Sequence, residues 1–107
     1  MKLSTIFRLA RKQMETDPKT SPYICDNIME VAPFLEGALA KRIINNRIGH
    51  EFSILDWLAA NRHITKEELE DLLLAQDDRE GELYRKLQNY RLAWLAELER
   101  EFAAKGE

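Results

Sequence analysis

The chain's two histidines lie in one stretch, RIGHEFSILDWLAANRH, which spans residues 47–63. His50, Glu51 and His63 have side chains that can bind a metal ion or transfer a proton. A metal site carried on a helix usually places two ligands four residues apart on one face, and these three residues lack that spacing. The pattern therefore favours turn positions for both histidines and predicts no metal site.

The same stretch contains the signals of a helix start. Ser53 and Asp56 are three residues apart and resemble a capping box in which aspartate replaces the usual Glu or Gln. We expect a short helix over residues 54–61, with one histidine in the turn at each end.

Cys25 is the only thiol. A catalytic cysteine needs a base within reach and an electropositive setting that lowers its pKa. Cys25 falls in the first turn of its expected helix, but it also shares an apolar stripe with Ile24 and Ile28. Free cysteine is commonly a small buried apolar residue, so the pattern favours a core position. A lone cysteine cannot form an internal disulfide, which indicates a reducing compartment.

No spacing matches a catalytic or cofactor motif. The four glycines are scattered, and neither a G-x-S-x-G elbow nor a cysteine-pair zinc pattern occurs. Carboxylates do lie four residues apart, as at Glu67 and Asp71, but on faces expected to be solvated. We therefore expect no enzyme activity and no cofactor.

Length and composition fit one domain over residues 1–107. The chain is 45% hydrophobic and carries a net charge of −3. A chain of this length can bury roughly 60–70% of the surface that it exposes when unfolded, so it needs no disulfide or metal to fold. No apolar run approaches the ~18 residues that span a bilayer, and the start lacks a secretory signal pattern. These features predict a cytoplasmic protein without a membrane segment.

Turn signals divide the chain into amphipathic helical segments, with no strand pattern. Ser21 is the expected N-cap of the second helix, with Pro22 at its first position and Pro33 at its end. Thr65 and Glu68 form a second capping box. The helices are expected at about residues 4–15, 22–32, 34–48, 54–61, 66–73 and 79–104.

The last helix carries an apolar seam formed by Leu83, Leu87, Tyr90, Trp94, Leu98 and Phe102. The seam is too wide for a two-stranded coiled coil and suits packing against several helices. Gly81 is expected to mark the point where the regular helix begins. The predicted fold is an all-α, compact bundle of five or six helices with a long C-terminal helix. If the seam instead pairs with a second copy, the protein is a homo-oligomer.

Acidic residues concentrate in residues 66–82, which hold eight carboxylates and two cations. Such a segment is usually a solvated face and less often a docking surface for a basic partner. Tyrosine, tryptophan and arginine dominate interface hot spots, so those beside the seam are further candidates, although they can equally be core residues. The partner-binding candidates are Glu70, Asp71, Asp77, Asp78, Tyr84, Arg91 and Trp94.

Basic residues on the first and third expected helices suggest an alternative function. If these helices are neighbours, their cations can form one patch that holds nucleic acid through phosphate contacts. The negative net charge and the absence of a clear helix–turn–helix spacing count against this function. The nucleic-acid candidates are Arg8, Arg11, Lys12, Lys41, Arg42 and Arg47.

Three phrases resemble a group of small proteins encoded by phages and prophages. They are YICDNI at residues 23–28, RIGHEFSILDWL at 47–58 and LQNYRLAWLAELEREF at 87–102. The group has an aromatic–Ile–Cys segment, an Arg–Leu–Gly phrase before a Leu–x–x–Trp–Leu helix, and a closing Tyr–Arg–x–x–Trp–Leu helix. Here Ile48 replaces the leucine of the second phrase, and HEFS replaces its more usual turn.

The resemblance carries over no catalytic residue and implies only a setting. It implies a phage accessory protein in the bacterial host cytoplasm that binds a host or phage protein, for example to block a defence system. The leading expectation is therefore a non-enzymatic interaction protein that binds or inhibits a host protein. A small nucleic-acid-binding protein is the alternative.

Overall fold

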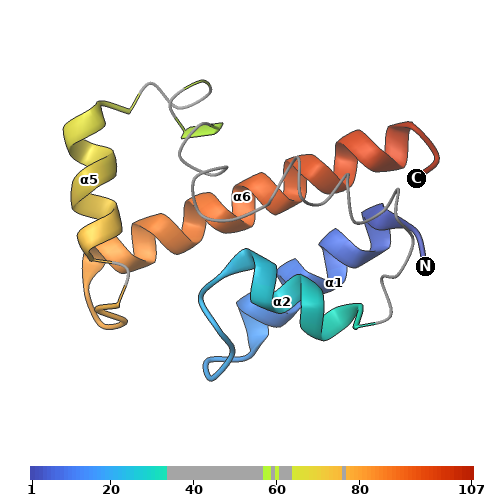
Figure 1. Cartoon of the computed structure of the whole chain (residues 1–107), viewed down its shortest axis with the longest axis horizontal. Helices are drawn as coiled ribbons and strands as arrows, with labels where there is room; N and C mark the ends of the chain where they lie inside the picture. The colour runs from blue at the N-terminus through green and yellow to red at the C-terminus, as the bar shows by residue number, and fades with distance from the viewer. Residues whose placement is uncertain (34–56, 59, 61–63, 76) are drawn as a thin grey trace.

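The computed structural model describes residues 1–33, 57–58, 60, 64–75 and 77–107 (Figure 1). These residues form α1 (Leu3–Thr16), α2 (Ile24–Val31), α5 (Lys66–Leu74) and α6 (Glu82–Ala104), with no strand among them. The all-α prediction and the long C-terminal helix are confirmed for the described residues. The expected count of five or six helices is not matched, because four helices are seen there. The helix expected over 34–48 and most of the one over 54–61 lie outside the described residues.

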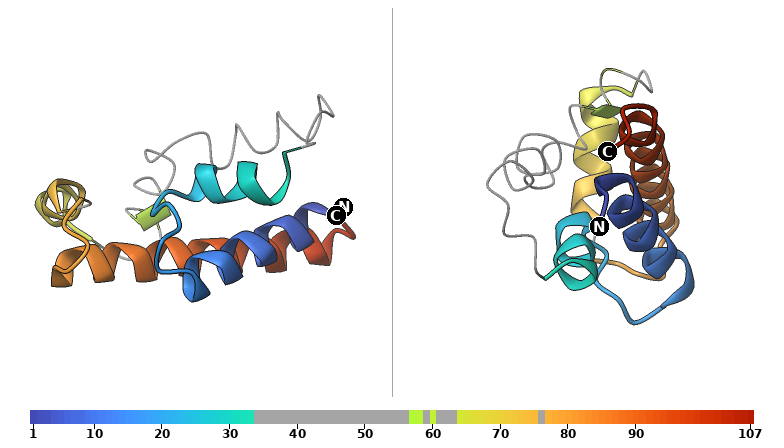
Figure 2. Two further views of the ribbon diagram at one scale, coloured as in Figure 1. Left: turned by 90° about the horizontal axis from the view of Figure 1, so that it is seen from below. Right: turned by 90° about the vertical axis from the view of Figure 1, so that its right-hand side faces the viewer.

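The core forms where α1 packs along α6. The two helices run antiparallel, so the chain termini lie at the same end of the molecule (Figures 1 and 2). The apolar residues of α1 recur along one face, as predicted, and that face is buried. The rings of Phe7 and Phe102 meet across this interface with their centroids 5.4 Å apart. The buried residues of the two helices in this cluster are Leu3, Ile6, Phe7 and Ala10 with Trp94, Leu95, Leu98 and Phe102.

The second helix begins later than predicted. α2 starts at Ile24, and its N-cap is Tyr23, which makes no side-chain cap. Ser21 is therefore not the N-cap: its hydroxyl accepts the Tyr23 N–H (3.2 Å) and donates to the Asp26 carboxylate (2.6 Å). These two bonds hold Ser21 in the turn before the helix. The helix ends at Val31, two residues before Pro33, as proline requires.

The loop between α1 and α2 contains a tight turn at residues 17–20. The Thr20 N–H donates to the Asp17 carbonyl (3.2 Å), and the Lys19 N–H donates to the Asp17 carboxylate (2.9 Å). Pro18 at the second position has the φ that such a turn needs, and aspartate at the first position is typical of it. A turn here agrees with the gap between the helices expected at about residues 4–15 and 22–32.

Asn27 ties this loop to both helices from a fully buried position on α2. Its amide nitrogen donates to the carbonyls of Ser21 and Tyr23, both at 2.8 Å. Its amide oxygen accepts the Thr20 hydroxyl (2.8 Å), and that hydroxyl accepts the side-chain amide of Gln13 on α1 (3.1 Å). The loop therefore has a defined shape, which matters because it forms one wall of a pocket.

Glycines mark both ends of α6. Gly81 is the N-cap, as predicted, with an extended backbone. At the other end Gly106 has a φ of 74°. Its N–H donates to the Ala103 carbonyl (3.0 Å), and the Glu107 N–H donates to the Phe102 carbonyl (2.8 Å). This is a Schellman motif, in which glycine takes the left-handed conformation without steric strain.

The predicted seam of α6 needs two corrections. Leu83 is 42% exposed and lies in the first turn of α6. That end of α6 extends beyond α1 and α2 (Figure 1). Arg91, which the prediction left out of the seam, is fully buried on that face. Leu87, Trp94, Leu98 and Phe102 are buried as expected, and Tyr90 is partly buried against the core.

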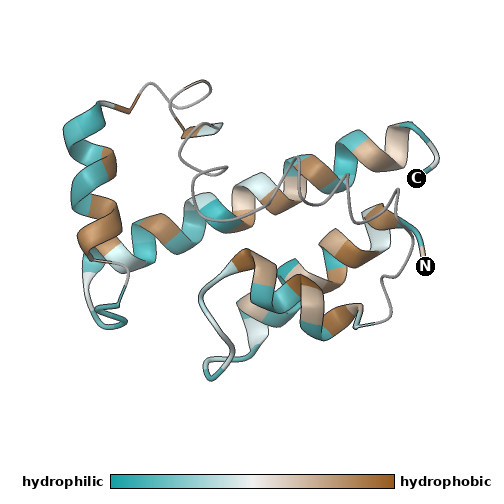
Figure 3. Ribbon diagram, viewed as in Figure 1, coloured by the Kyte–Doolittle hydropathy of each residue, from teal (hydrophilic) through white to brown (hydrophobic). Residues whose placement is uncertain are grey.

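α5 lies across the end of α6 that is opposite the termini (Figures 1 and 2). Leu72 is its one buried residue, so most of the helix faces solvent. Figure 3 shows α5 as mainly hydrophilic, with hydrophobic colour concentrated toward its C-terminal end. None of the four described helices is both long enough and apolar enough to cross a membrane.

Candidate functional site

A side-chain cap fixes the start of α5. The Thr65 hydroxyl accepts the Glu68 N–H at 3.2 Å, and it lies 3.2 Å from the Glu68 carboxylate, to which it donates. The main bond of the predicted capping box, from the Glu68 N–H to the Thr65 hydroxyl, is thus present. Glu67 and Glu68 fall in the first turn, where the positive end of the helix dipole favours negative charge. The helix dipole therefore accounts for the two carboxylates at the start of α5 without a bound ligand.

All eight acidic residues in 66–82 are exposed. None of them forms an ion pair with another residue in the part of the chain that the structure describes. An exposed carboxylate without a cation keeps its full charge toward solvent. This surface is therefore a source of negative potential.

One large apolar residue lies within this acidic surface. Leu74 is 85% exposed, more than any other large hydrophobic residue that the structure describes. Residues three, four and seven positions apart share one face of a helix. Leu74 therefore lies on the same face as Glu67, Glu70 and Asp71, and we call these four residues the acidic face of α5.

The loop after α5 continues the negative charge. The Asp78 N–H donates to the Ala75 carbonyl (3.1 Å), and the Gly81 N–H donates to the Asp78 carbonyl (2.9 Å). A Cβ at Gly81 would lie 2.7 Å from the Asp78 carboxylate oxygen, so a side chain at this position would displace the aspartate. This tight loop keeps Asp77 and Asp78 exposed immediately beyond the acidic face.

The other three partner-binding candidates differ in their exposure. Tyr84 is partly exposed and lines a pocket. Arg91 is fully buried, and Trp94 is only 6% exposed. The idea that Arg91 and Trp94 flank the seam and contact a partner directly is therefore wrong, because both fill the seam.

Arg91 helps to form the core around α6. Its guanidinium lies 5.4 Å from the centre of the Tyr23 ring and donates to the side-chain oxygen of Gln88. Leu87 and Leu95, four residues away on either side, are also buried. That spacing is the signal by which Arg91 can be placed on the buried face, even though arginine is usually exposed.

Trp57 is a further aromatic residue near this part of α6. Its indole N–H donates to the Glu97 carboxylate at 2.9 Å, and its ring centroid is 6.5 Å from that of Trp94. Trp57 is partly buried against the core. The two tryptophans therefore pack together, so neither is a free anchor for a partner.

The basic patch is only partly described. Arg11 pairs with the Glu99 carboxylate of α6 (2.6 Å) and with Glu15 (3.6 Å), so two carboxylates balance its charge. Arg8 and Lys12 are exposed on α1. The other three candidates, Lys41, Arg42 and Arg47, lie outside the described residues. The convergence of these six cations stays a prediction.

The candidate catalytic and metal-binding residues are likewise only partly described. Cys25 lies in the first turn of α2, partly buried and packed against the core. His50, Glu51 and His63 lie outside the described residues. Within the described part, no group of three or more His, Cys, Asp or Glu side chains could hold a metal ion.

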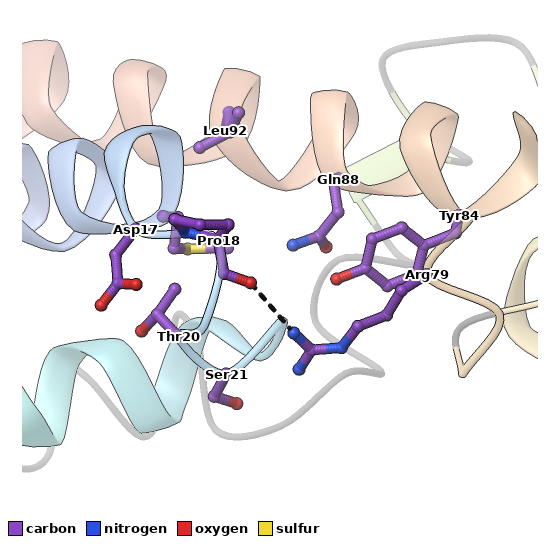
Figure 4. A pocket seen from close by; sticks show the side chains of 9 residues that line it. Asp17, Pro18, Thr20, Ser21, Arg79, Tyr84, Gln88 and Leu92 are labelled. Carbon is purple, nitrogen blue, oxygen red and sulfur yellow. Dashed lines mark hydrogen bonds between the residues drawn. The ribbon is translucent and has the colours of Figure 1, made fainter. Parts of the chain in front are cut away.

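A pocket of about 200 Å³ lies between the α1–α2 loop and the N-terminal half of α6 (Figure 4). Arg79 borders it and donates to the Pro18 carbonyl at 3.4 Å. Tyr84 and Gln88 enter it from α6, and Met14 and Leu92 supply apolar surface. The sequence reasoning missed this pocket because its residues come from segments far apart in the chain.

Comparison of the chain with protein-family models, curated proteins and solved structures gives no match.

Proposed function

We propose that this protein acts by binding another protein through the acidic face of α5 and the loop that follows. The observation that carries the proposal is the exposure of Leu74 among carboxylates without cation partners in the described structure. A leucine at such a position adds nothing to the core. It does supply the apolar contact area that interfaces need, beside charges that steer a partner.

The chemistry of this surface defines the partner. A complementary surface carries lysine or arginine around a small apolar depression that accepts the leucine side chain. A helix or loop with cations on either side of apolar residues meets both needs. Negative charge opposes nucleic acid at this face, since DNA and RNA are themselves polyanions.

The biological setting of the proposal rests on the sequence resemblance alone. It is that of a phage-type accessory protein in the bacterial cytoplasm that binds, and thereby inhibits, a host protein. Defence proteins are one class of target for such a protein.

The proposed surface is tested by capture of partners from bacterial lysate at low and high salt. Exposed charges are largely screened beyond about 3 Å at ~1 M salt, so capture should weaken sharply as salt rises. Glu70→Lys/Asp71→Lys and Asp77→Lys/Asp78→Lys should each reduce capture, and Leu74→Ser should reduce it without changing its salt dependence.

The matched control is Glu30→Lys/Glu107→Lys, which reverses two exposed carboxylates outside residues 66–82. It changes the net charge by the same amount as each test variant, and it should leave capture intact. Equal effects from the control and the test variants would show that only overall charge matters, and the proposed surface would then be wrong.

A further inference from the structure

The pocket beside α6 contains hydrogen-bond donors that have no acceptor among the described residues. The Thr20 and Ser21 hydroxyls already bond to Asn27 and Asp26. The Gln88 side-chain oxygen accepts a hydrogen bond from Arg91. The N–H₂ group of the same amide is therefore the part of Gln88 that can donate to a ligand. Neither this group nor the Tyr84 hydroxyl has a hydrogen-bond partner within the described part of the chain.

Arg79 completes this set of donors. Figure 4 shows Arg79, Tyr84 and Gln88 on one side of the pocket, with Pro18, Thr20 and Ser21 facing them from the other. The single bond from Arg79 to the Pro18 carbonyl is long, at 3.4 Å, so a charged acceptor can replace it. The other guanidinium donors have no partner among the residues that the structure describes. A planar guanidinium with neighbouring N–H and O–H donors is the arrangement that binds a carboxylate.

Nearby carboxylates favour an anion with a single negative charge. Asp17 lines the same pocket with its carboxylate away from the Arg79 end (Figure 4). Asp77, Asp78 and Glu80 are exposed close to Arg79 in the chain. A phosphate or a dicarboxylate would bring a second negative charge toward these groups, whereas a monocarboxylate would not.

Apolar surface and size define the rest of the ligand. Met14 and Leu92 line the pocket beside the polar groups. A volume of about 200 Å³ is below the ~300–1,000 Å³ of drug-sized sites, so only a small ligand or the end of a longer one fits.

We propose that this pocket binds an organic monocarboxylate with a short apolar tail, held at Arg79, Gln88 and Tyr84. The ligand is a small free acid or the C-terminal residue of a peptide, which share this chemistry. This proposal is independent of the one for the acidic face of α5. The proposed partner of that face is cationic, whereas the ligand of this pocket carries no positive charge.

The test is an NMR titration of ¹⁵N-labelled full-length protein with N-acetyl-leucine and with its neutral amide, N-acetyl-leucinamide. The acid should shift the amide signals of Thr20, Ser21 and Gln88, with a dissociation constant of about 1–10 mM, typical of a ligand of this size. The amide should bind at least about tenfold more weakly, because it lacks the charge that Arg79 recognises. N-acetyl-glycyl-glycyl-leucine, titrated in parallel, should bind more tightly than N-acetyl-leucine if the ligand is a peptide terminus, and no more tightly if it is a free acid.

Variants locate the binding within the pocket. Arg79→Gln should weaken binding of the acid about tenfold, and Tyr84→Phe should weaken it by a smaller factor. Arg85→Gln is the matched control, because Arg85 is exposed on α6, does not line the pocket and should not affect binding. Equal binding of acid and amide, the absence of shifts, or an unchanged affinity in Arg79→Gln would each overturn the proposal.

Discussion

Two buried polar side chains, Asn27 and Arg91, show how single residues specify this core. Each polar atom of the Asn27 side chain has a partner, so burial leaves no group without a hydrogen bond. Arg91 packs its guanidinium over Tyr23 and bonds Gln88, which places the Gln88 amide at the pocket. Both residues connect α2 and α6 to the segments that form the pocket walls.

Replacement of Asn27 by alanine should lower the free energy of unfolding by about 2–3 kcal/mol. The reason is that three hydrogen bonds of a fully buried side chain are lost, those with the Ser21 carbonyl, the Tyr23 carbonyl and the Thr20 hydroxyl, and each contributes about 0.5–1.5 kcal/mol. Urea unfolding followed by circular dichroism measures the change. Asn89→Ala, on the exposed face of α6, is the control and should change stability by less than about 0.5 kcal/mol. Similar losses in both variants would contradict the role assigned to the Asn27 bonds.

The helices differ in how they are stabilised. α1 and α6 share an apolar interface that includes the paired rings of Phe7 and Phe102. α5 buries one residue, Leu72, and therefore depends more on its own capping and charge pattern. A helix of nine residues is marginal without packing or caps, so α5 is expected to open more readily than α1 or α6.

The loss of the α5 cap should therefore act locally. Thr65→Ala should destabilise α5 by about 1 kcal/mol, the usual value of an N-cap hydroxyl. Amide hydrogen exchange should accelerate about fivefold in α5 and remain unchanged in α1. Thr65→Ser retains the hydroxyl and should restore the wild-type rates. Equal acceleration in both helices would mean that α5 and the core unfold together.

The core interface and the acidic face can be compared with two substitutions that remove the same number of carbon atoms. Ile6→Ala should lower the free energy of unfolding by about 2–5 kcal/mol, because Ile6 is fully buried between helices. Leu74→Ala should change it by less than about 0.5 kcal/mol, because Leu74 is 85% exposed. Thermal or urea unfolding distinguishes them. A large loss in Leu74→Ala would show that this residue serves the fold and would weaken its proposed role in binding.

For the molecule as a whole, helical periodicity predicted most of the buried helix faces. Local capping signals predicted only some of the helix ends. The apolar stripe of α1 and most of the α6 seam were predictable, because burial recurs every three or four residues. The start of α2 was not, because Ser21 bonds to Asp26 instead of capping the helix. The burial of Arg91 and the pocket at Arg79 depend on contacts between distant segments, which local patterns do not contain.

The same packing bears on self-association. The α6 seam is buried within its own chain, where Trp94, Leu95, Leu98 and Phe102 belong to the core. Pairing of two copies along this seam would require α1 to leave α6. Light scattering should therefore give a mass near 12.5 kDa at every concentration tested. A mass that rises toward a dimer, and falls to the monomer in an α6 seam variant that remains folded, would contradict this arrangement.

The claim that this protein acts by binding another protein is tested most directly by affinity capture of the tagged full-length chain from bacterial lysate, with and without nuclease. We predict a stoichiometric protein partner that survives nuclease and is identified by mass spectrometry. The Glu70→Lys/Asp71→Lys variant should lose this partner, and the Glu30→Lys/Glu107→Lys control should keep it. Partners that disappear with nuclease would contradict the account, and would favour nucleic-acid binding through the basic residues of the chain.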